Sequence, residues 1–379
     1  MSPKNLFIFG AGASKADNAP LNDELIKEIF SILKHNGDIQ SNPSINSLQT
    51  FLFKMYPITR EFQNDKDKYP TFEEILGLLQ FAINRDESFK GFSQDQLREF
   101  INLIIALMAL VIEKKAATSN KINKKFITEL FKNFKKQHQN LELDKTMEKF
   151  AKQNYFLNIN YDILLDSALY KLKNQNDNCD IDYCLEIKDP NMPSKDIKIF
   201  KPHGSLNWLI CKSCGLRTIG NVLKIGMESI RATIWGRGLN NCSQCGTKMS
   251  AIIIPPTFFK ELNTDPIRNI LVNLENHLKE VQNLIFIGYS FPEADLHLKY
   301  VFKKAQLFEG FKKIILIDKN IENIPKESRP YFKNIIRSFP GVQLVDLTSE
   351  IPLNEGLAEN SIKAIIDHLS RHIYTDHKN

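Results

Sequence analysis

The chain has 379 residues, of which 42% are hydrophobic, 25% charged and 10% aromatic. This composition is typical of a folded globular protein and excludes collagen-like, mucin-like and wholly disordered chains. Lysine and arginine number 50 against 44 acidic residues. The formal net charge of +6 permits anionic ligands, but it does not amount to the dense basic patch of a dedicated DNA-binding protein.

The start of the chain, MSPKNLFIFGAGAS, lacks the layout of a signal peptide. The most apolar stretch, 100–112, is shorter than the roughly 20 residues that a membrane span needs. We therefore expect a soluble, cytoplasmic protein that does not contact a membrane.

The first part of the chain is predicted to begin with a strand and to continue as helices. A short apolar run at 5–9 predicts the first strand, and apolar residues at helical spacing predict a helix at 21–33. From about residue 45 to 150 the sequence is rich in Lys and Asn and contains no convincing strand. The helices expected there lie at 71–83, 94–115, 123–138 and 144–153.

Strands and helices alternate in the remainder of the chain. Strands are expected at 155–159, 197–201, 251–254, 284–287, 313–317 and 342–346, and helices at 161–172, 261–281, 294–306, 325–338 and 359–372. This alternation predicts an α/β fold with a Rossmann-like, mostly parallel sheet that helices cover on both faces. Such sheets bind ligands at the carboxyl ends of their strands, near a topological switch point.

Four of the six cysteines form two Cys-x-x-Cys pairs, Cys211 with Cys214 and Cys242 with Cys245, and a glycine follows each pair. Two such pairs are typical of a structural zinc site with four thiolate ligands. Disulfides or four unrelated thiols remain alternatives, although disulfides are typical of secreted proteins. Cys179 and Cys184 fit no standard metal pattern, and we expect free thiols there.

Polar clusters follow several predicted strands. The first, Gly10-Ala11-Gly12-Ala13-Ser14, would let backbone N–H groups approach a phosphate. Lys15 stands where a dinucleotide-binding loop has its third glycine, so a simple strand-to-helix turn is the alternative.

The second cluster is Asn158-Ile159-Asn160-Tyr161-Asp162, in which Asp162 or an asparagine is suited to cap the next helix. In the third, His203 precedes Gly204, a placement that suits a general base as well as a structural histidine. Gly288 and Ser290 suit phosphate or ribose contacts, and Asp318 suits ribose hydroxyls.

Taken in order, these motifs resemble the sirtuin (SIR2) family over about 1–40 and 154–350. The resemblance implies that the NAD diphosphate lies at Gly10, Ala11, Gly12 and Ser14, with further cofactor contacts at Gly288, Ser290 and Asp318. It implies a catalytic His203, with Asn160 and Asp162 beside it. It also makes Cys211, Cys214, Cys242 and Cys245 the zinc ligands.

The sequence departs from deacylating sirtuins at the positions that handle acyl-lysine. Their Gly-Ile-Pro and Phe-Arg segment is replaced by 15–21, their glutamine before the catalytic asparagine by Ile159, and their Phe-Gly-Glu stretch by 254–260. The remaining motifs are similar to those of the SIR2-like NADases of bacterial antiphage defence. Members of that group hydrolyse NAD⁺ to ADP-ribose and nicotinamide, some beside a HerA-type ATPase.

This resemblance implies an NAD⁺ glycohydrolase with NAD⁺ as substrate and Zn²⁺ as a structural ion. Asn160 would position water or the ribose hydroxyls, His203 would accept a proton, and Asp162 would support Asn160. An NAD-dependent protein deacylase or ADP-ribosyltransferase remains one alternative. A non-catalytic subunit that binds NAD or ADP-ribose in a larger assembly remains another.

The domain boundaries follow from these assignments. We expect the NAD-binding domain at 1–44, 154–210 and 246–350, a helical insertion at 45–153, a zinc-binding module at 211–245, and a C-terminal helix at 351–379. The insertion is expected to serve assembly, as a homo-oligomer or with a HerA-type ATPase partner, so that nucleic acid is contacted only through a partner. A lid or a self-contained helical bundle is the alternative for the insertion. A flexible segment at 15–20 and the insertion are expected to restrain the resting enzyme.

Overall fold

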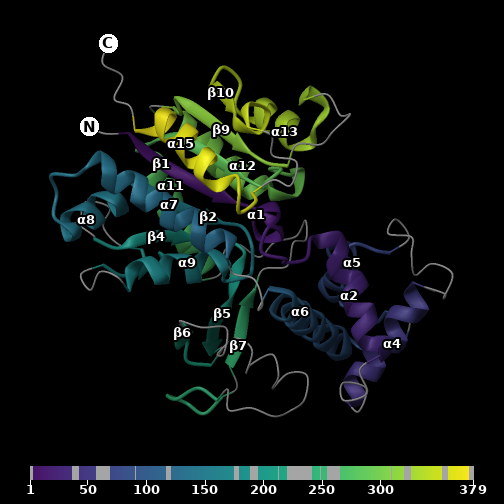
Figure 1. Cartoon of the computed structure of the whole chain (residues 1–379). Helices are drawn as coiled ribbons and strands as arrows, with labels where there is room; N and C mark the ends of the chain where they lie inside the picture. Colours follow the sequence, from purple (N-terminus) through teal and green to yellow (C-terminus); the bar gives the residue numbers. More distant parts are fainter. Residues whose placement is uncertain are drawn as a thin grey trace. The chain divides into compact units, whose positions relative to one another are not determined.

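The computed structural model describes residues 3–35, 42–56, 69–89, 91–116, 121–174, 179–187, 195–211, 213–219, 241–247, 249–253, 265–308, 310–319, 326–351 and 357–374. The chain divides into two compact units (Figure 1). The first unit comprises Met1–Ala19, Ser119–Pro202 and Leu262–Asn379, and the second comprises Pro20–Thr118 and His203–Glu261.

The first unit is built on a seven-stranded sheet in the order β10-β9-β8-β1-β2-β4-β3. Its strands are β1 (Lys4–Phe9), β2 (Asn154–Asn158), β3 (Ile181–Asp182), β4 (Ile197–Phe200), β8 (Val281–Ile287), β9 (Lys313–Ile317) and β10 (Gln343–Asp346). Every pairing described in this sheet is parallel. The predicted α/β fold with a mostly parallel sheet is therefore confirmed.

The strands that follow β1 in the sequence are added first on one side of it and later on the other. This reversal of the strand order creates a topological switch point between β1 and β8. β2, β4 and β3 lie on one side of β1, and β8, β9 and β10 lie on the other. Phe9 pairs with Ile287, so β1 and β8 end at the same level. The segments that follow these strands, beginning at Gly10 and Gly288, therefore meet where open α/β sheets bind their ligands.

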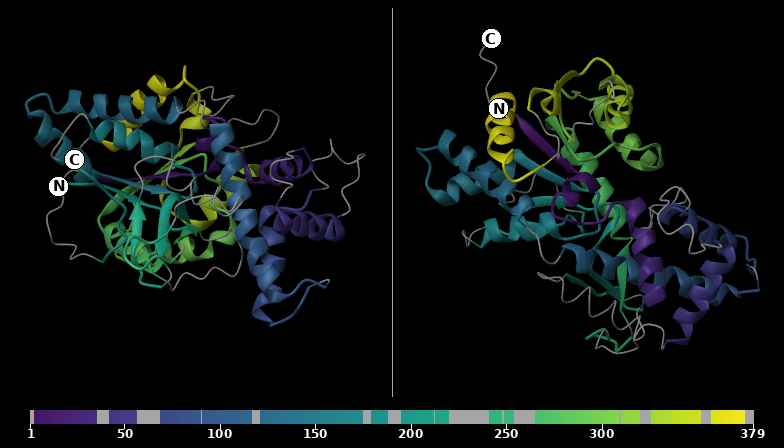
Figure 2. Two further views of the ribbon diagram at one scale, coloured as in Figure 1. Left: turned by 90° about the horizontal axis from the view of Figure 1, so that it is seen from below. Right: turned by 45° about the vertical axis from the view of Figure 1, so that its right-hand side comes forward.

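Two helical layers cover this sheet, as Figure 2 (left) shows. In one layer α7 (Ile122–Gln137) packs against α9 (Leu164–Lys173) and α15 (Ile362–Ile373), and in the other α11 (Ile267–Leu278) packs against α12 (Leu296–Gln306). Because both faces are covered, β2 and β9 are buried along their whole length. The unit also contains α1 (Ala11–Lys15), α8 (Leu143–Gln153), α13 (Pro330–Ser338) and α14 (Leu347–Glu350).

Three buried asparagines fix the register of the central strands near their amino ends. Asn5 of β1 lies opposite both Asn154 of β2 and Asn283 of β8. The Asn5 amide donates to Asn154 Oδ1 at 3.0 Å, and Asn283 donates to Asn5 Oδ1 at 2.9 Å. A slip of either strand would leave buried amides without partners, which is costly in the interior.

In its described residues, the second unit combines four helices with a small antiparallel sheet. α6 (Gln94–Ala116) packs against α2 (Asn22–His35), α4 (Pro43–Met55) and α5 (Phe72–Asn84). Side chains cap α4 and α5 at their starts, because Asn42 Oδ1 accepts from Ser44 N and Thr71 Oγ1 accepts from Glu74 N. The sheet has the order β6-β5-β7, formed by β5 (Gly204–Cys211), β6 (Arg217–Ile219) and β7 (Met249–Ile253).

The helices expected at 71–83, 94–115, 123–138 and 144–153 are present as α5, α6, α7 and α8. They are divided between the units, since α5 and α6 lie in the second and α7 and α8 in the first. No strand was predicted at β5, whose eight residues are almost all buried and therefore show no simple alternation. The domain boundaries given above remain predictions.

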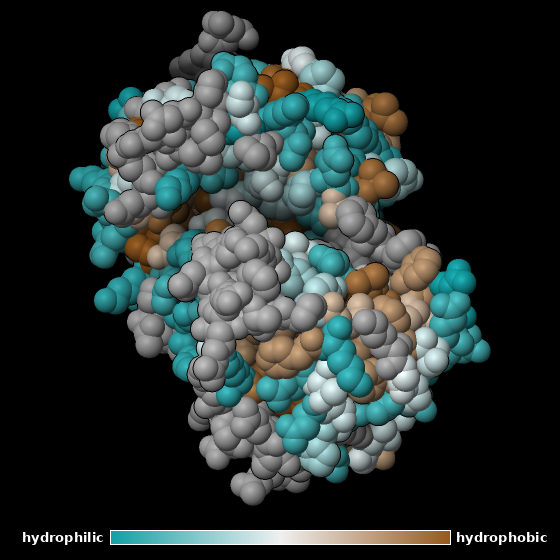
Figure 3. Space-filling model, turned by 90° about the vertical axis from the view of Figure 1, so that its right-hand side faces the viewer, coloured by the Kyte–Doolittle hydropathy of each residue, from teal (hydrophilic) through white to brown (hydrophobic). Residues whose placement is uncertain are grey.

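Hydrophobic residues also reach the surface. Leu78 and Phe81 of α5 are exposed, and Figure 3 shows hydrophobic residues at the surface on the side of the molecule that faces right in Figure 1. None of the described helices combines the length and the hydropathy that crossing a membrane requires.

Candidate active site

The glycine-rich segment after β1 packs directly on the segment after β8. A Cβ atom on Gly12 would lie 2.8 Å from Gly288 Cα, and one on Gly10 would lie 2.5 Å from Tyr289 Cβ. Gly288 has φ +57°, and a Cβ there would lie 2.3 Å from Ala13 N. Glycine is therefore required at these positions by the close approach of two backbone segments.

Backbone hydrogen bonds join the same two segments. Gly10 N donates to Ile287 O at 3.0 Å, Gly12 N to Gly288 O at 2.9 Å, and Ala13 N to Gly10 O at 3.0 Å. These three N–H groups thus have partners inside the protein. Contact of Gly10, Ala11, Gly12, Ser14 or Gly288 with a phosphate stays a prediction.

Asn160 lies just beyond β2 and binds the glycine-rich segment with its side chain. Its Nδ2 is 2.8 Å from Gly10 O and 2.8 Å from Ser14 Oγ. A backbone carbonyl only accepts hydrogen bonds, so the amide nitrogen must face Gly10. This orientation uses both amide hydrogens and leaves Oδ1 as the acceptor of a half-buried side chain.

Asp162 continues this network behind Ser14. Its Oδ1 accepts from the N–H of Leu164, the first residue of α9, at 3.0 Å, although the N-cap residue of this helix is Ile163. The Ser14 hydroxyl donates to the same carboxylate. Since Ser14 has a single hydroxyl hydrogen, it donates to Asp162 and accepts from Asn160. Burial raises the pKa of Asp162, while the nearby Lys201 ammonium and the Ser14 bond act in the opposite direction.

Two residues that sequence reasoning missed lie beneath this network. Lys201 Nζ donates to Asp162 O at 2.6 Å and is 3.1 Å from Asp166 Oδ2, and both side chains are almost fully buried. Tyr183 donates to Asp166 Oδ1 at 2.8 Å. Lysine and aspartate are seldom fully buried unless they are paired with an opposite charge. A lysine directly after an apolar strand and an aspartate on the apolar face of a helix could therefore have indicated a buried ion pair.

The segment after α1 is anchored at Asp17. Its buried carboxylate accepts from the N–H groups of Lys121, Ile122 and Asn123 at 2.7–2.9 Å, at the start of α7. Asn18 takes the left-handed conformation, with φ +64°. The expectation of a freely flexible 15–20 segment is therefore wrong at Asp17, because four hydrogen bonds including that from Asn123 Nδ2 hold its carboxylate.

His203 is buried in the second unit, immediately before β5. Gly204 has φ +84°, and a Cβ there would lie 2.1 Å from Ile252 O, so the glycine after the histidine is needed where β5 meets β7. The partnership of His203 with Asn160 stays a prediction.

The two remaining candidates follow β8 and β9. The Ser290 side chain is exposed, and its backbone oxygen accepts from Asn334 Nδ2 at 3.1 Å. Asp318 donates from its backbone N to Thr348 Oγ1 at 2.9 Å, and its Oδ1 accepts from Lys319 N at 2.7 Å. Burial raises the pKa of Asp318 to about 6, and nearby Asp346 adds to the shift.

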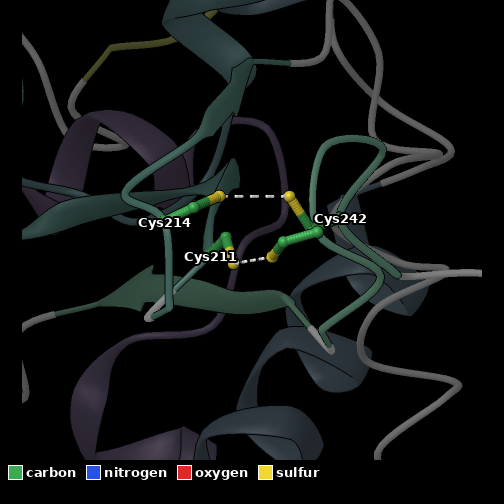
Figure 4. Close-up of side chains that lie close together, drawn as sticks. Cys211, Cys214 and Cys242 are labelled. Atoms are coloured by element: carbon green, nitrogen blue, oxygen red, sulfur yellow. Dashed lines mark hydrogen bonds between the residues drawn. The ribbon is translucent and has the colours of Figure 1, made fainter.

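The four paired cysteines lie together, as Figure 4 shows, where Cys211, Cys214 and Cys242 are labelled. All four sulfurs lie within 4.8 Å of one another, with Cys211–Cys245 and Cys214–Cys242 each at 3.4 Å. Four thiolates around one zinc ion at about 2.3 Å would be separated by about 3.8 Å, so the donor set fits a tetrahedral zinc site. Cys179 and Cys184 are buried elsewhere, in the first unit.

The two Cys-x-x-Cys turns have the same backbone design. Gly215 N donates to Cys211 O and Gly246 N to Cys242 O, both at 2.9 Å. Both glycines have positive φ, +76° and +74°. Each turn thereby aims two sulfurs at one point, as a zinc knuckle requires.

No model of a protein family matches the sequence, and no curated protein matches it. Solved structures that match include a SIR2 homologue in complex with NAD, at 13% identity and a TM-score of 0.42, covering 98% of this chain and 91% of that one. A Sir2 enzyme studied for mechanism and regulation matches at 11% identity and 0.38, covering 98% and 94%. A sirtuin studied for substrate affinity matches at 12% and 0.38, covering 97% and 93%.

Proposed function

We propose that this protein is an NAD⁺ glycohydrolase, which cleaves NAD⁺ to ADP-ribose and nicotinamide. The observation that carries the proposal is the orientation of Asn160. Its amide is bound on one side to Gly10 and Ser14, at the switch point of a parallel sheet. The remaining Oδ1 is suited to accept a hydrogen bond from a ribose hydroxyl or from the attacking water.

The proposed reaction breaks the bond between ribose C1′ and the nicotinamide nitrogen. The bonding pair leaves with nicotinamide, which becomes neutral, and positive charge develops on the ribose ring. A water oxygen bonds to C1′, and the proton it loses goes to a base. Since the leaving group is already activated, the protein mainly has to orient ribose and water and exclude other nucleophiles.

The candidate residues divide these tasks. Asn160 orients the ribose or the water, and Asp162 holds Asn160 through Ser14. His203 accepts the proton as general base, a role worth about 10²–10⁴-fold in rate. Asp318 accepts from adenosine ribose hydroxyls. A zinc ion on Cys211, Cys214, Cys242 and Cys245 would have four thiolate ligands, which is typical of a structural site.

Product analysis on the purified full-length chain tests this proposal. We expect equimolar ADP-ribose and nicotinamide from NAD⁺ without any acylated peptide. Asn160→Ala and His203→Ala should each abolish turnover and leave the circular dichroism spectrum unchanged, while the exposed Asn140→Ala should behave as wild type.

Three results would contradict the proposed activity, and a fourth would contradict the site assignment. Turnover that depends on an acylated peptide would indicate a deacylase, and transfer of ADP-ribose to protein would indicate a transferase. Binding of NAD⁺ without turnover would indicate a non-catalytic subunit. Turnover within about threefold of wild type in both the Asn160 and the His203 variant would refute the site assignment.

The proposed biological role is antiphage defence by NAD⁺ depletion, in a homo-oligomer or beside a HerA-type ATPase. The sequence resemblance supports this role, and the exposed Leu78 and Phe81 of α5 are compatible with assembly. Sedimentation of the purified chain, alone and with the ATPase, is the direct test. A monomer at working concentration that binds no such ATPase would count against the proposal.

A further inference from the structure

Beneath the candidate site lies an ion pair that the proposed chemistry does not use. Lys201 follows β4, and its side chain is 0% exposed. Asp166 is on α9 and is 1% exposed. The Lys201 ammonium lies 3.3 and 3.1 Å from the two carboxylate oxygens of Asp166. Burying two charges is expensive and is retained only where partners compensate the loss of water.

This pair is joined directly to the candidate site. The Lys201 ammonium also donates to the backbone oxygen of Asp162, at 2.6 Å, its shortest described hydrogen bond. Asp162 in turn accepts from Ser14, and Ser14 accepts from Asn160. A buried cation thus binds the backbone of Asp162, and the carboxylate of that residue holds the proposed catalytic amide through Ser14.

We propose that Lys201 and Asp166 are positioning residues, and that the Lys201 ammonium keeps Asp162 ionised so that Ser14 and Asn160 hold their orientation. This inference rests on the proposed function for its kinetic consequence. Only an ionised Asp162 must accept from Ser14, because a protonated carboxyl can donate to the serine oxygen instead. The Ser14 hydroxyl hydrogen would then no longer be directed at Asp162, so the direction of the hydrogen bonds from Ser14 to its neighbours would no longer be fixed.

The charges facing Asp162 act in opposite senses. Burial raises the pKa of Asp162, and the charge of Asp166 on α9 raises it further. The Lys201 ammonium after β4 lowers this pKa, as do the hydrogen bonds from Ser14 of α1 and from the Leu164 N–H. Removing the Lys201 charge should therefore move the ionisation of Asp162 to higher pH. Removing the Asp166 charge, with the isosteric Asn still able to accept from Tyr183, should move it to lower pH.

Because Lys201 and Asp166 shift the pKa of Asp162 in opposite directions, replacing each of them in turn tests the proposal. The ionisation of Asp162 is followed by ¹³C NMR of the full-length protein labelled at aspartate Cγ, with Asp162→Asn to assign the signal. We expect Lys201→Met to raise the midpoint by about 1–3 pH units, as for loss of an adjacent charge. Asp166→Asn should lower it. The acid limb of the kcat–pH profile should shift in the same two directions.

A purely structural ion pair would give a different result. Both variants would then lose stability and activity while the Asp162 midpoint stayed within 0.3 units of wild type or moved the same way in both, and this outcome overturns the inference.

The double variant Lys201→Met/Asp166→Leu removes both charges of the ion pair together, so neither of the two is left buried without the other. It covers the case in which Lys201→Met alone does not fold, and its midpoint should also lie above that of wild type. A midpoint at or below that of wild type would overturn the inference. Absence of NADase activity in the wild type would refute the proposed function instead, since the NMR titration does not depend on turnover.

Discussion

At the scale of single residues, a glycine at the switch point can serve either the close packing of two backbone segments or the binding of a diphosphate. The glycine-rich motif alone does not distinguish these two roles. Gly12 and Gly288 are needed because two backbone segments touch there. That requirement exists whether or not a diphosphate binds beside them. A glycine-rich motif after a strand is therefore weaker evidence for a nucleotide than the side chains of Asn160 and Asp318.

We predict that Gly12→Ala and Gly288→Ala both destabilise the protein, by about 1–3 kcal/mol for overpacking. Gly288→Ala should be the worse of the two, because its positive φ adds strain. Gly77→Ala is the matched control. Nothing lies within 4 Å of a Cβ at that position in α5, so it should stabilise by about 0.5–1 kcal/mol. Urea unfolding measures all three, and equal midpoints would refute the packing argument.

The pKa of about 6 at Asp318 predicts a pH dependence of NAD⁺ binding. The ionised carboxylate accepts from two ribose hydroxyls, whereas the protonated form loses an acceptor site. Affinity should therefore rise between pH 5 and 7 and level off above that range. Titration calorimetry with the Asn160→Ala variant, which should not consume the ligand, measures it.

Asp318→Asn is the control for this dependence. It should bind NAD⁺ more weakly at pH 7.5 and show no rise between pH 5 and 7. If the rise persists in Asp318→Asn, another group is responsible for it.

At the scale of elements, the single strand β5 connects the proposed general base to the cysteine cluster, which are separate motifs in the sequence. His203 immediately precedes the strand, and Cys211 is its last residue. Gly204 is held against β7 at one end, and at the other Cys211 N donates to Leu216 O at 2.8 Å. An ion on the four cysteines would therefore stabilise the strand that directly follows the proposed general base.

We predict one zinc ion per chain, measured by mass spectrometry on protein purified without chelator. Cys211→Ser and Cys242→Ser should each lose the metal and lower the melting temperature, because structural zinc contributes folding free energy directly. Cys179→Ser removes a buried thiol outside the cluster and should keep the zinc. Metal-free wild-type protein would refute the assignment.

At the scale of the whole molecule, the proposed activity demands restraint. An enzyme that consumed NAD⁺ freely would kill its own cell. A misplacement of catalytic groups by about 1 Å costs roughly 10²-fold in rate, so small rearrangements are sufficient to hold the resting state inactive. Asp17 anchors the segment beside Ser14, which leaves self-association or a partner as the more direct means of control.

We therefore predict that specific activity rises with protein concentration or on addition of a partner. Association would shift the population toward the competent state by its differential affinity for the two states. An NAD⁺-loss assay from nanomolar to micromolar protein, beside sedimentation at the same concentrations, tests this. Constant activity across that range, with expression as harmless as that of Asn160→Ala, would exclude such a restraint.

The sequence by itself determined the elements and the chemistry at their ends. Hydrophobic periodicity placed most of the described helices and strands, because burial selects apolar residues at the period of each element, although it missed α4 and β5. Alternation of the two indicated a parallel sheet, and the cysteine spacing indicated a cluster that the structure contains. These signals are local, so each can be read from a short stretch of chain.

Only the tertiary structure decided what depends on residues far apart in the sequence. It placed β8 beside β1, aligned Asn5 with Asn154 and Asn283, and anchored Asp17 to the start of α7. It also paired Lys201 with Asp166 beneath Asp162. A buried polar residue is stable only with a specific partner, and the identity of that partner is set by how the chain packs rather than by its neighbours in sequence.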